Sequence, residues 1–228
     1  MKYLFYTFLI SSILTVSSCI KDELTKPAEV TFQFLIDNEQ LDGKFMDFQS
    51  GTIVVKEIGF EGYRETGEDV FFTSDFDSAI LADLGNGTTS ELIRFDIPQG
   101  IYQHINLSIE IDSTIQDPSL TLNGIYNSVR NGQIPVIFEF DYHEILNLNP
   151  EPGHGKAKIV LNKDIPTTAV TLISTGFLFQ IANSRMLESA EITQREGESV
   201  IVISKDVNQN IFNLIVNRLG NSFTVLFN

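Results

Sequence analysis

The side chains that could do chemistry in this sequence gather most closely between residues 139 and 143. Glu139, Asp141 and His143 alternate there with apolar residues, so a β-strand would place all three on one face. Three such groups could bind a divalent cation. The solvent face of a half-buried strand must be polar in any case, and we favour this simpler explanation. We therefore predict no metal site at this strand.

Other chemical motifs in the chain are incomplete. His143 is followed by glutamate as in the helical zinc-binding pattern, but Asn147 stands where that pattern needs a second histidine. His154 lies between two glycines, whose flexibility suits neither a base nor a metal ligand. The acidic loops at residues 37–42 and 75–77 lack the spacing of a helix-loop-helix calcium site. With no nucleophile elbow and no phosphate loop, we predict no catalytic residues and no cofactor.

Composition limits the classes of partner. The formal charge is −15, and no stripe of Lys or Arg offsets it, so we predict no binding to nucleic acid. Such acidity is consistent with bound cations or a basic partner, but solubility alone explains it. The chain has 18 Phe and 43% hydrophobic residues, which is enough to form a sizeable core.

The only cysteine, Cys19, follows an apolar run at the start of the chain. Lys2 precedes this run, which extends from Tyr3 to Val16 and is too short to span a membrane but long enough for a signal peptide. Two small residues, Ser17 and Ser18, separate the run from Cys19. A lone cysteine cannot form an internal disulfide, so its position points to another role.

The segment Val16-Ser17-Ser18-Cys19 resembles the lipobox of bacterial lipoproteins, in which the cysteine is acylated and becomes the first mature residue. This resemblance implies that residues 1–18 are a signal peptide and that Cys19 anchors residues 19–29, a tether, to the lipid bilayer. Lys21, Asp22 and Glu23 resemble the surface-export tag of Bacteroidota lipoproteins. The tag implies an outer-membrane location facing the cell surface.

Strand patterns dominate residues 30–173. Residues 30–36 alternate, residues 52–62 alternate with a slip that indicates a β-bulge, and residues 101–111 alternate without interruption. We predict that Ile101 and Ile105 point inward and that Tyr102 points outward. A tight turn is predicted at Pro98-Gln99-Gly100, and residues 133–143 should form another strand with Tyr142 inward. Residues 75–90 resemble a short strand or helical turn between loops. The fold class is therefore mainly β, an antiparallel β-sandwich.

The last 55 residues change in pattern. Apolar residues recur at helical spacing in residues 176–190, with Ser174 or Thr175 as caps, and again in residues 207–219, where Gly220 ends the stripe. Residues 200–203 and 222–227 resemble strands. We therefore predict that residues 174–228 form a small α/β extension packed on the sandwich. We also predict that the last strand pairs within its own sheet and that the protein is a monomer.

The Val/Ile-rich strand, the Asp-Leu-Gly segment and the Ile-Pro-Gln-Gly-Ile-Tyr turn within Thr52–Ile111 resemble a transthyretin-like sandwich domain of bacterial lipoproteins. The ending, from Ile203 to Asn208 and beyond, is similar to uncharacterised Bacteroidota lipoproteins. The resemblance implies a fold and a location but no reaction.

We expect a non-catalytic binding or adhesion module with an extracellular or periplasmic ligand. The alternatives are a fimbrillin-like subunit of a surface assembly, or a hydrolase of glycan or peptide. The absence of Trp weakens a sugar-binding role, although Tyr could substitute.

Overall fold

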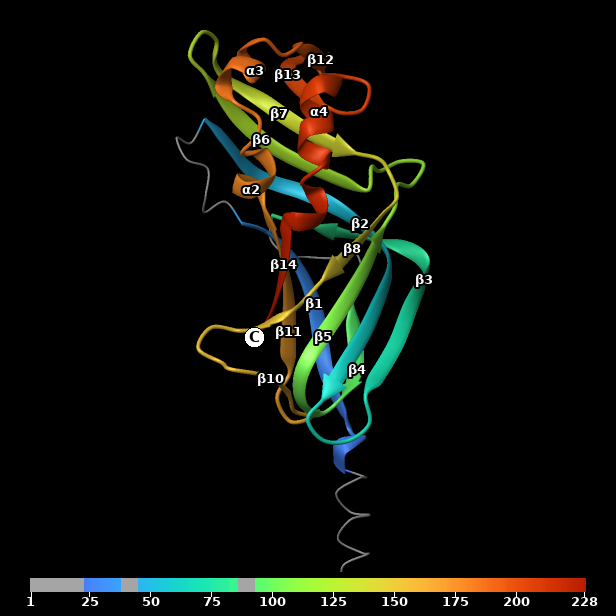
Figure 1. Cartoon of the computed structure of the whole chain (residues 1–228). Coiled ribbons are helices and arrows are strands. Elements are labelled where there is room, and N and C mark those ends of the chain that lie inside the picture. The colour runs from blue at the N-terminus through green and yellow to red at the C-terminus, as the bar shows by residue number, and fades with distance from the viewer. Residues whose placement is uncertain (1–22, 38–44, 86–92) are drawn as a thin grey trace, which may run out of the picture.

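The computed structural model describes residues 23–37, 45–85 and 93–228, which form two β-sheets and several short helices (Figure 1). The smaller sheet has five strands, in the order β4 (Arg94–Pro98), β1 (Pro27–Asp37), β11 (Thr167–Ser174), β14 (Phe223–Phe227) and β9 (Glu151–Pro152). The main path of the larger sheet runs β10 (Ile159–Leu161), β5 (Gly100–Ile111), β2 (Met46–Arg64), β6 (Leu120–Ser128), β7 (Gly132–Phe140), β13 (Glu198–Ile203) and β12 (Thr193–Arg195). In addition, β3 (Val70–Asp83) pairs with β2, and β8 (Glu144–Leu148) pairs with β5.

Strand β2 spans the length of the larger sheet and joins two halves of the molecule. Its first part, Met46–Ile53, pairs with β6, and its second part, Val55–Arg64, pairs with β5. Register shifts after Phe48 and after Val55 mark bulges, and buried side chains continue along one face of β2 across both of them. The predicted bulge in residues 52–62 is confirmed.

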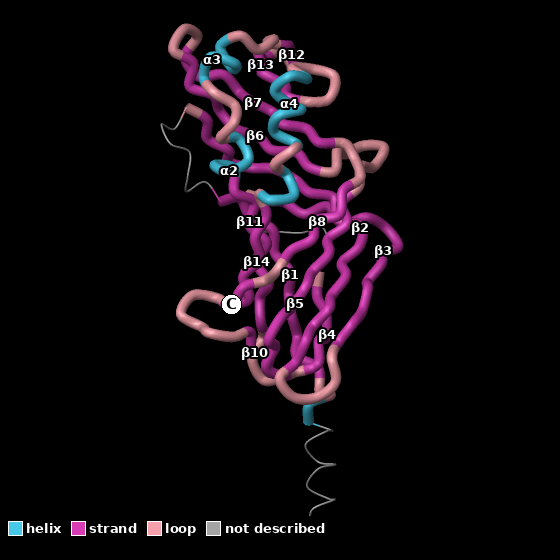
Figure 2. Tube along the Cα trace, viewed as in Figure 1, coloured by secondary structure: helices cyan, strands magenta, loops and turns pink. Residues whose placement is uncertain are grey.

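The two halves are closed by different layers. In the sandwich half, β3, β2, β5, β8 and β10 face the five-stranded sheet, and Phe72 of β3 contacts Phe95 of β4 across the core, with ring centroids 5.4 Å apart. In the helical half, the sheet formed by β2, β6, β7, β13 and β12 is covered by helices gathered at one end of the molecule (Figure 2). These helices are α2 (Thr175–Phe179), α3 (Ser184–Glu188), α4 (Gln209–Val216) and the 3₁₀ turn η1 (Leu219–Asn221).

Aromatic contacts fasten the helices to the sheet. Phe179 of α2 stacks on Phe48 of β2 at 4.2 Å and meets Phe138 of β7 edge-on at 5.5 Å. Phe138 also stacks with Phe212 of α4 at 5.9 Å. The buried side chains of both halves form one continuous hydrophobic cluster. Burial on this scale is the main driving force for folding, so we expect the halves to fold together.

The mainly β fold with a small C-terminal helical region is confirmed. The last strand, β14, pairs with β11 in its own sheet, as predicted, and also lies beside β9. Three pairs of strands are parallel, namely β1 with β11, β13 with β7 and β14 with β9, which alternation alone did not indicate. Strand β13 belongs to the larger sheet and β14 to the smaller one, so the C-terminal residues contribute to both layers.

Several local predictions were wrong for identifiable reasons. Residues 75–83 belong to β3, whose pairing with β2 lapses between Asp75 and Ile80 and then resumes. Tyr102 is buried and Ile101 is exposed, because a bulge between Tyr63 and Arg64 in the pairing of β2 with β5 inverts the alternation there. Tyr142 is exposed, because β7 already ends at Phe140.

The C-terminal helices are also shorter than predicted. The stripe at residues 176–190 is broken into α2 and α3, because Asn183 caps a new helix by accepting a hydrogen bond from the Met186 amide at 3.1 Å. Ser174 caps α2, as predicted. Helix α4 ends at Val216, before η1. The predicted tether is shortened too, because β1 begins at Pro27.

Candidate functional site

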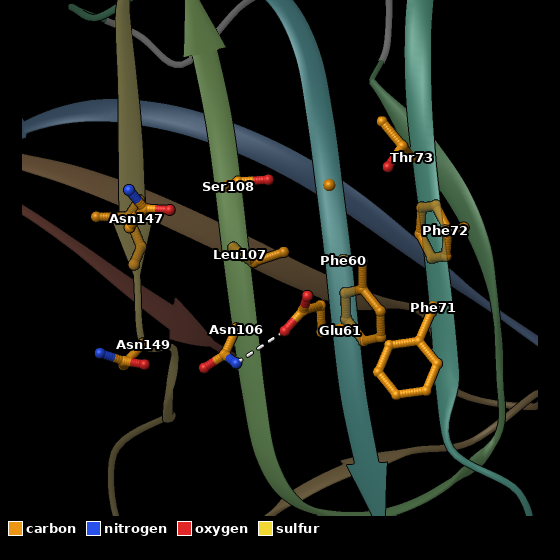
Figure 3. A pocket seen from close by; sticks show the side chains of 12 residues that line it. Phe60, Glu61, Phe71, Phe72, Thr73, Asn106, Leu107, Ser108, Asn147 and Asn149 are labelled. Carbon is orange, nitrogen blue, oxygen red and sulfur yellow. Dashed lines mark hydrogen bonds between the residues drawn. The ribbon is translucent and has the colours of Figure 1, made fainter.

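The candidate site is a hollow of about 650 Å³ on the outer face of the sandwich half, away from the five-stranded sheet (Figure 3). It crosses four neighbouring strands, β3, β2, β5 and β8. Its lining is formed by Gly59, Phe60, Glu61, Phe71, Phe72, Thr73, Asn106, Leu107, Ser108, Asn147, Leu148 and Asn149. Phe60 and Leu107 are buried members of the core, so outward side chains of alternating residues determine the chemistry of the surface.

Gly59 forms the floor of the hollow. It lies opposite Ser108 in the pairing of β2 with β5, and a side chain at position 59 would collide with the Ser108 hydroxyl. Its neighbours on this face carry longer side chains, among them Glu61 and Asn106. The absence of a side chain at position 59 leaves room for the short Ser108 side chain to lie against β2, so the surface is lower here than at Glu61 and Asn106.

The walls of the hollow are polar and almost free of charge. Asn106 donates a hydrogen bond to the Glu61 carboxylate at 3.0 Å, which fixes the two side chains relative to each other. Asn147 and Asn149 project from β8 and the residues just after it, and both are exposed. Glu61 is the one charged residue in the lining, and no histidine, lysine or arginine contributes to it. The described lining therefore offers mainly neutral donors and acceptors.

An aromatic group forms one rim. The Phe71 side chain is 58% exposed, which is unusual for a large apolar residue on a strand. Tyr63 meets it edge-on with ring centroids 5.7 Å apart, and His104 stacks on the other side of Tyr63 at 6.1 Å. The three rings support one another along the outer face, so Phe71 presents an apolar surface beside the polar hollow.

A second hollow, of about 230 Å³, adjoins the first. The segment Asn147–Asn149 lines both, and the second hollow extends from there to η1 and β14. Its further lining residues include Glu151, Asn221 and Thr224. A ligand longer than one small molecule could therefore follow the surface across β8.

The predicted polar trio does not converge on one point. Glu139 receives two hydrogen bonds from the Arg195 guanidinium, at 2.6 and 3.0 Å, while Asp141 pairs with Lys205 at 2.7 Å. His143 instead lies 3.2 Å from Glu110 of β5. Within residues 23–37, 45–85 and 93–228, no group of three His, Cys, Asp or Glu is arranged to hold a metal ion. His154 is exposed in its loop.

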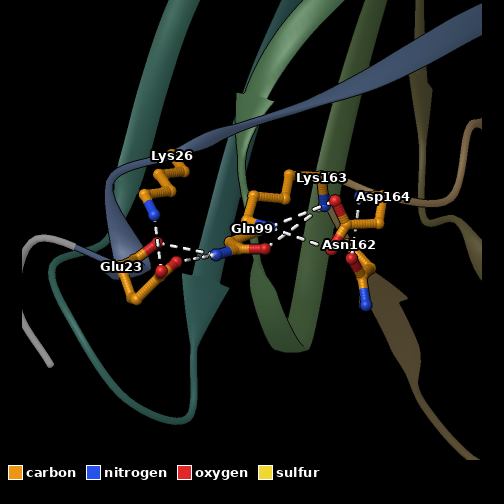
Figure 4. A network of polar contacts seen from close by, with 6 residues as sticks. All are labelled: Glu23, Lys26, Gln99, Asn162, Lys163 and Asp164. Atoms are coloured by element: carbon orange, nitrogen blue, oxygen red, sulfur yellow. Dashed lines mark hydrogen bonds and ion pairs between the residues drawn. The ribbon is translucent and has the colours of Figure 1, made fainter.

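The described chain starts at a polar network that we call the base clamp, formed by Glu23, Lys26, Arg64 and Gln99. Figure 4 shows the side chains of Glu23, Lys26 and Gln99 in this network. Gln99 donates to the backbone oxygen of Glu23 at 2.7 Å and to its carboxylate at 3.2 Å. Arg64 donates to the backbone oxygen of Leu24 at 2.7 Å. Lys26 pairs with Glu23, and its hydrogen bond lowers the pKa of that carboxyl group.

The base clamp holds residues 23–26 against the end of the sandwich half. The predicted turn at Gln99 carries the chain from β4 in one sheet to β5 in the other. The side chain and backbone of Gln99 therefore face the start of β1. Of the predicted anchor and tag residues, only Glu23 lies within the described residues. Cys19, Lys21, Asp22, the signal peptide and residues 38–42 of the first acidic loop lie outside them.

The helical half has a polar network of its own around Glu188. One carboxylate oxygen accepts hydrogen bonds from Tyr126 and Ser128 at 2.8 Å and from the Val129 amide at 2.9 Å. The Tyr126 and Ser128 bonds lower the pKa of Glu188, while burial and Glu188 together raise the pKa of Tyr126 to about 12. This network attaches α3 to β6 and is a structural feature rather than a binding site.

Comparison with known proteins returned no matching family model, no matching curated protein and no matching solved structure. Among the described helices, none has both the length and the apolar content required to cross a bilayer.

Sequence patterns did not reveal this hollow. The uninterrupted alternation in residues 101–111 implies that Asn106 and Ser108 lie on the face opposite Ile105, as the structure shows. It could not indicate that Gly59 lies opposite Ser108, or that Asn147 lies on the neighbouring strand. The outward amides, a strand glycine and an exposed Phe71 are the signals that could have pointed to the site, but only once the strand order is known.

Proposed function

We propose that this protein is a lipid-anchored outer-membrane module that binds a ligand in the hollow on the sandwich half and does not catalyse a reaction. The main support for this proposal is the lining of that hollow, which combines neutral hydrogen-bonding groups with an exposed aromatic rim. Binding sites combine a depression with a few directed polar groups in this way. Hydrolysis of a glycan uses a pair of carboxyl groups, whereas the described lining contains one carboxylate, Glu61, which accepts a hydrogen bond from Asn106.

The anchor proposal is supported by the sequence around Cys19 and by the position of the base clamp. Only Ile20, Lys21 and Asp22 separate Cys19 from Glu23, where the described chain is attached to the sandwich. Four residue steps span at most roughly 14 Å. With Cys19 acylated, the base clamp would face the bilayer, and the helices would lie at the far end (Figure 1). The hollow would then open sideways, parallel to the membrane.

The fimbrillin-like alternative gains no support from the C-terminus. Such an assembly by strand donation requires a strand that can leave its own sheet. Strand β14 instead lies between β11 and β9, with partners on both sides. The monomer therefore stays part of the proposal.

Metabolic labelling with a clickable palmitate tests the anchor. The wild-type protein should be labelled and recovered with outer membranes, and Cys19→Ala should abolish both. Ser18→Ala is the matched control, because it retains a small residue before the cysteine. Labelling of Cys19→Ala would contradict the anchor.

Protease shaving of intact cells tests the surface location. Changing Lys21, Asp22 and Glu23 together to Ala should protect the protein from the protease. Because Glu23 also belongs to the base clamp, Lys26→Ala is the control: it removes the ion pair but leaves the tag unchanged. A wild-type protein that resists shaving would place the domain on the periplasmic side.

A further inference from the structure

We infer that the hollow binds an uncharged, polyhydroxylated chain, namely a stretch of a neutral polysaccharide. This inference deepens the proposed binding function and depends on it. The hydrogen-bonding groups of the lining, its charge and the shape of the surface all favour such a ligand.

The lining matches hydroxyl groups. Three asparagines, Asn106, Asn147 and Asn149, each present an N–H donor and a carbonyl acceptor on one side chain. Ser108 and Thr73 add hydroxyls that can also play both roles. A sugar hydroxyl likewise donates and accepts, so pairs of neighbouring hydroxyls can satisfy an amide completely. Since most of these groups lie on paired strands, their positions are fixed before a ligand arrives.

The charge distribution excludes anionic ligands. The two adjoining hollows carry the carboxylates of Glu61 and Glu151, and no lysine or arginine belongs to either described lining. Phosphate, sulfate and carboxylate groups are recognised by cationic side chains, above all by arginine. The net charge of −15 adds repulsion at longer range. A neutral polymer meets none of these costs.

The rim and shape favour a sugar chain over a peptide. Phe71 offers an exposed ring held edge-on by Tyr63, on which the apolar C–H face of a pyranose could pack. An extended peptide that adds to a sheet needs an unpaired strand edge, whereas this hollow crosses the face of four paired strands. The hollows on both sides of Asn147–Asn149 provide room for several consecutive sugar units.

Native gel electrophoresis through gels containing polysaccharide tests the inference on the full-length protein. The probes are glucan, mannan, galactan and xylan as neutral chains, with polygalacturonate and chondroitin sulfate as anionic chains. We expect at least one neutral chain, and no anionic chain, to retard the protein. Asn147→Ala with Asn149→Ala should weaken that binding about tenfold, because the hydrogen bonds from two side chains to the sugar hydroxyls are lost. Phe71→Ala should weaken it as well.

The matched control is Gln49→Ala with Gln133→Ala, which removes two exposed amides from the helical half and should bind like wild type. Retardation by neutral chains that persists in the double asparagine variant overturns the inference. Retardation by anionic chains alone also overturns it, but leaves the binding function standing. Failure to bind any of the six chains overturns the inference, and the anchor experiments remain unaffected because they do not depend on the ligand.

Discussion

The two halves of the larger sheet share strand β2 but present different outer surfaces. On the helical half, Arg195 of β12 forms two hydrogen bonds with Glu139 of β7, and Lys205 pairs with Asp141 nearby. On the sandwich half, the outer surface around Gly59 is hollow, lined with amides and hydroxyls, and carries one carboxylate. Charged pairs satisfy one another and contribute little beyond solubility at an exposed surface. In the hollow, Asn106 donates to Glu61 and Asn147 donates to the Ile145 backbone oxygen, and each amide keeps a second N–H and a carbonyl oxygen for a ligand.

The inner faces of the two halves are alike in composition but are covered by different elements. Both are apolar and belong to one core, but the sandwich half is closed by a sheet and the helical half by three short helices. None of these helices exceeds eight residues, and isolated helices of that length are unstable in water. Their stability must come from packing on the sheet through residues such as Phe179 and Phe212. The halves should therefore be thermodynamically coupled through β2.

The largest expected effect is the loss of stability when a buried phenylalanine is removed from the core of either half. Phe60→Ala removes a buried ring that contacts Phe72 and Tyr102 in the sandwich half, and Phe138→Ala removes one that contacts Phe179 and Phe212 in the helical half. Each should lower the free energy of unfolding by about 3–5 kcal/mol. Because the core is continuous, calorimetry should show one transition for both variants. Two separated transitions in Phe138→Ala would mean that the helical half unfolds alone.

A smaller, pH-dependent effect is expected from Glu188 in the helical half. Hydrogen bonds from Tyr126 and Ser128 lower the pKa of Glu188 in the folded protein. The carboxylate therefore stabilises the fold above the ordinary glutamate pKa, and this contribution is lost as the pH falls through the lowered pKa. Glu188→Gln should be less stable than wild type at neutral pH, and the difference should shrink in acid. Thermal melts over a pH series measure it; a difference that grows in acid would contradict the assignment.

The smallest effect concerns the base clamp in the sandwich half. Arg64→Ala removes hydrogen bonds to the backbone oxygens of Leu24, Glu68 and Gln99 and should lower the free energy of unfolding by about 1–2 kcal/mol. Its clearer sign should be faster cleavage after Glu23 by a glutamate-specific protease in the folded protein. Arg94→Ala is the control, since Arg94 pairs with Glu29 on β1 and not with the clamp. Equal cleavage of the two variants would show that Arg64 does not hold residues 23–26.

Much of the fold could be predicted from local patterns. Alternation over residues 30–36 and 133–140 located β1 and β7 and their buried faces, because one face of each is in the core and the other in solvent. The bulge in β2 was visible as a slip in that alternation. The bulge near Tyr102 was not, because isoleucine at position 101 preserves the apparent pattern while the backbone inverts it.

Long-range features could not be predicted in the same way. Spacing in residues 176–190 indicates an apolar stripe but not the cap at Asn183 that divides it into two helices. Parallel pairing of β1 with β11 joins strands separated by more than a hundred residues, and local sequence does not encode such partners. The candidate site likewise depends on the order of β2, β5 and β8 in the larger sheet, because Gly59, Asn106 and Asn147 become neighbours only through that sheet.

The central claim is that one outer half-surface binds a ligand and the other does not. Amide chemical shifts of the isotopically labelled protein, followed during titration with fragments of the neutral polysaccharide that retards it most, test this claim directly. We expect changes to concentrate at Gly59, Asn106, Ser108, Asn147 and Asn149, while the amides of Ile137 and Arg195 on the helical half stay unchanged. Changes that concentrate at Ile137 and Arg195, or a saturated titration that leaves Gly59 and Asn147 unmoved, would contradict the account.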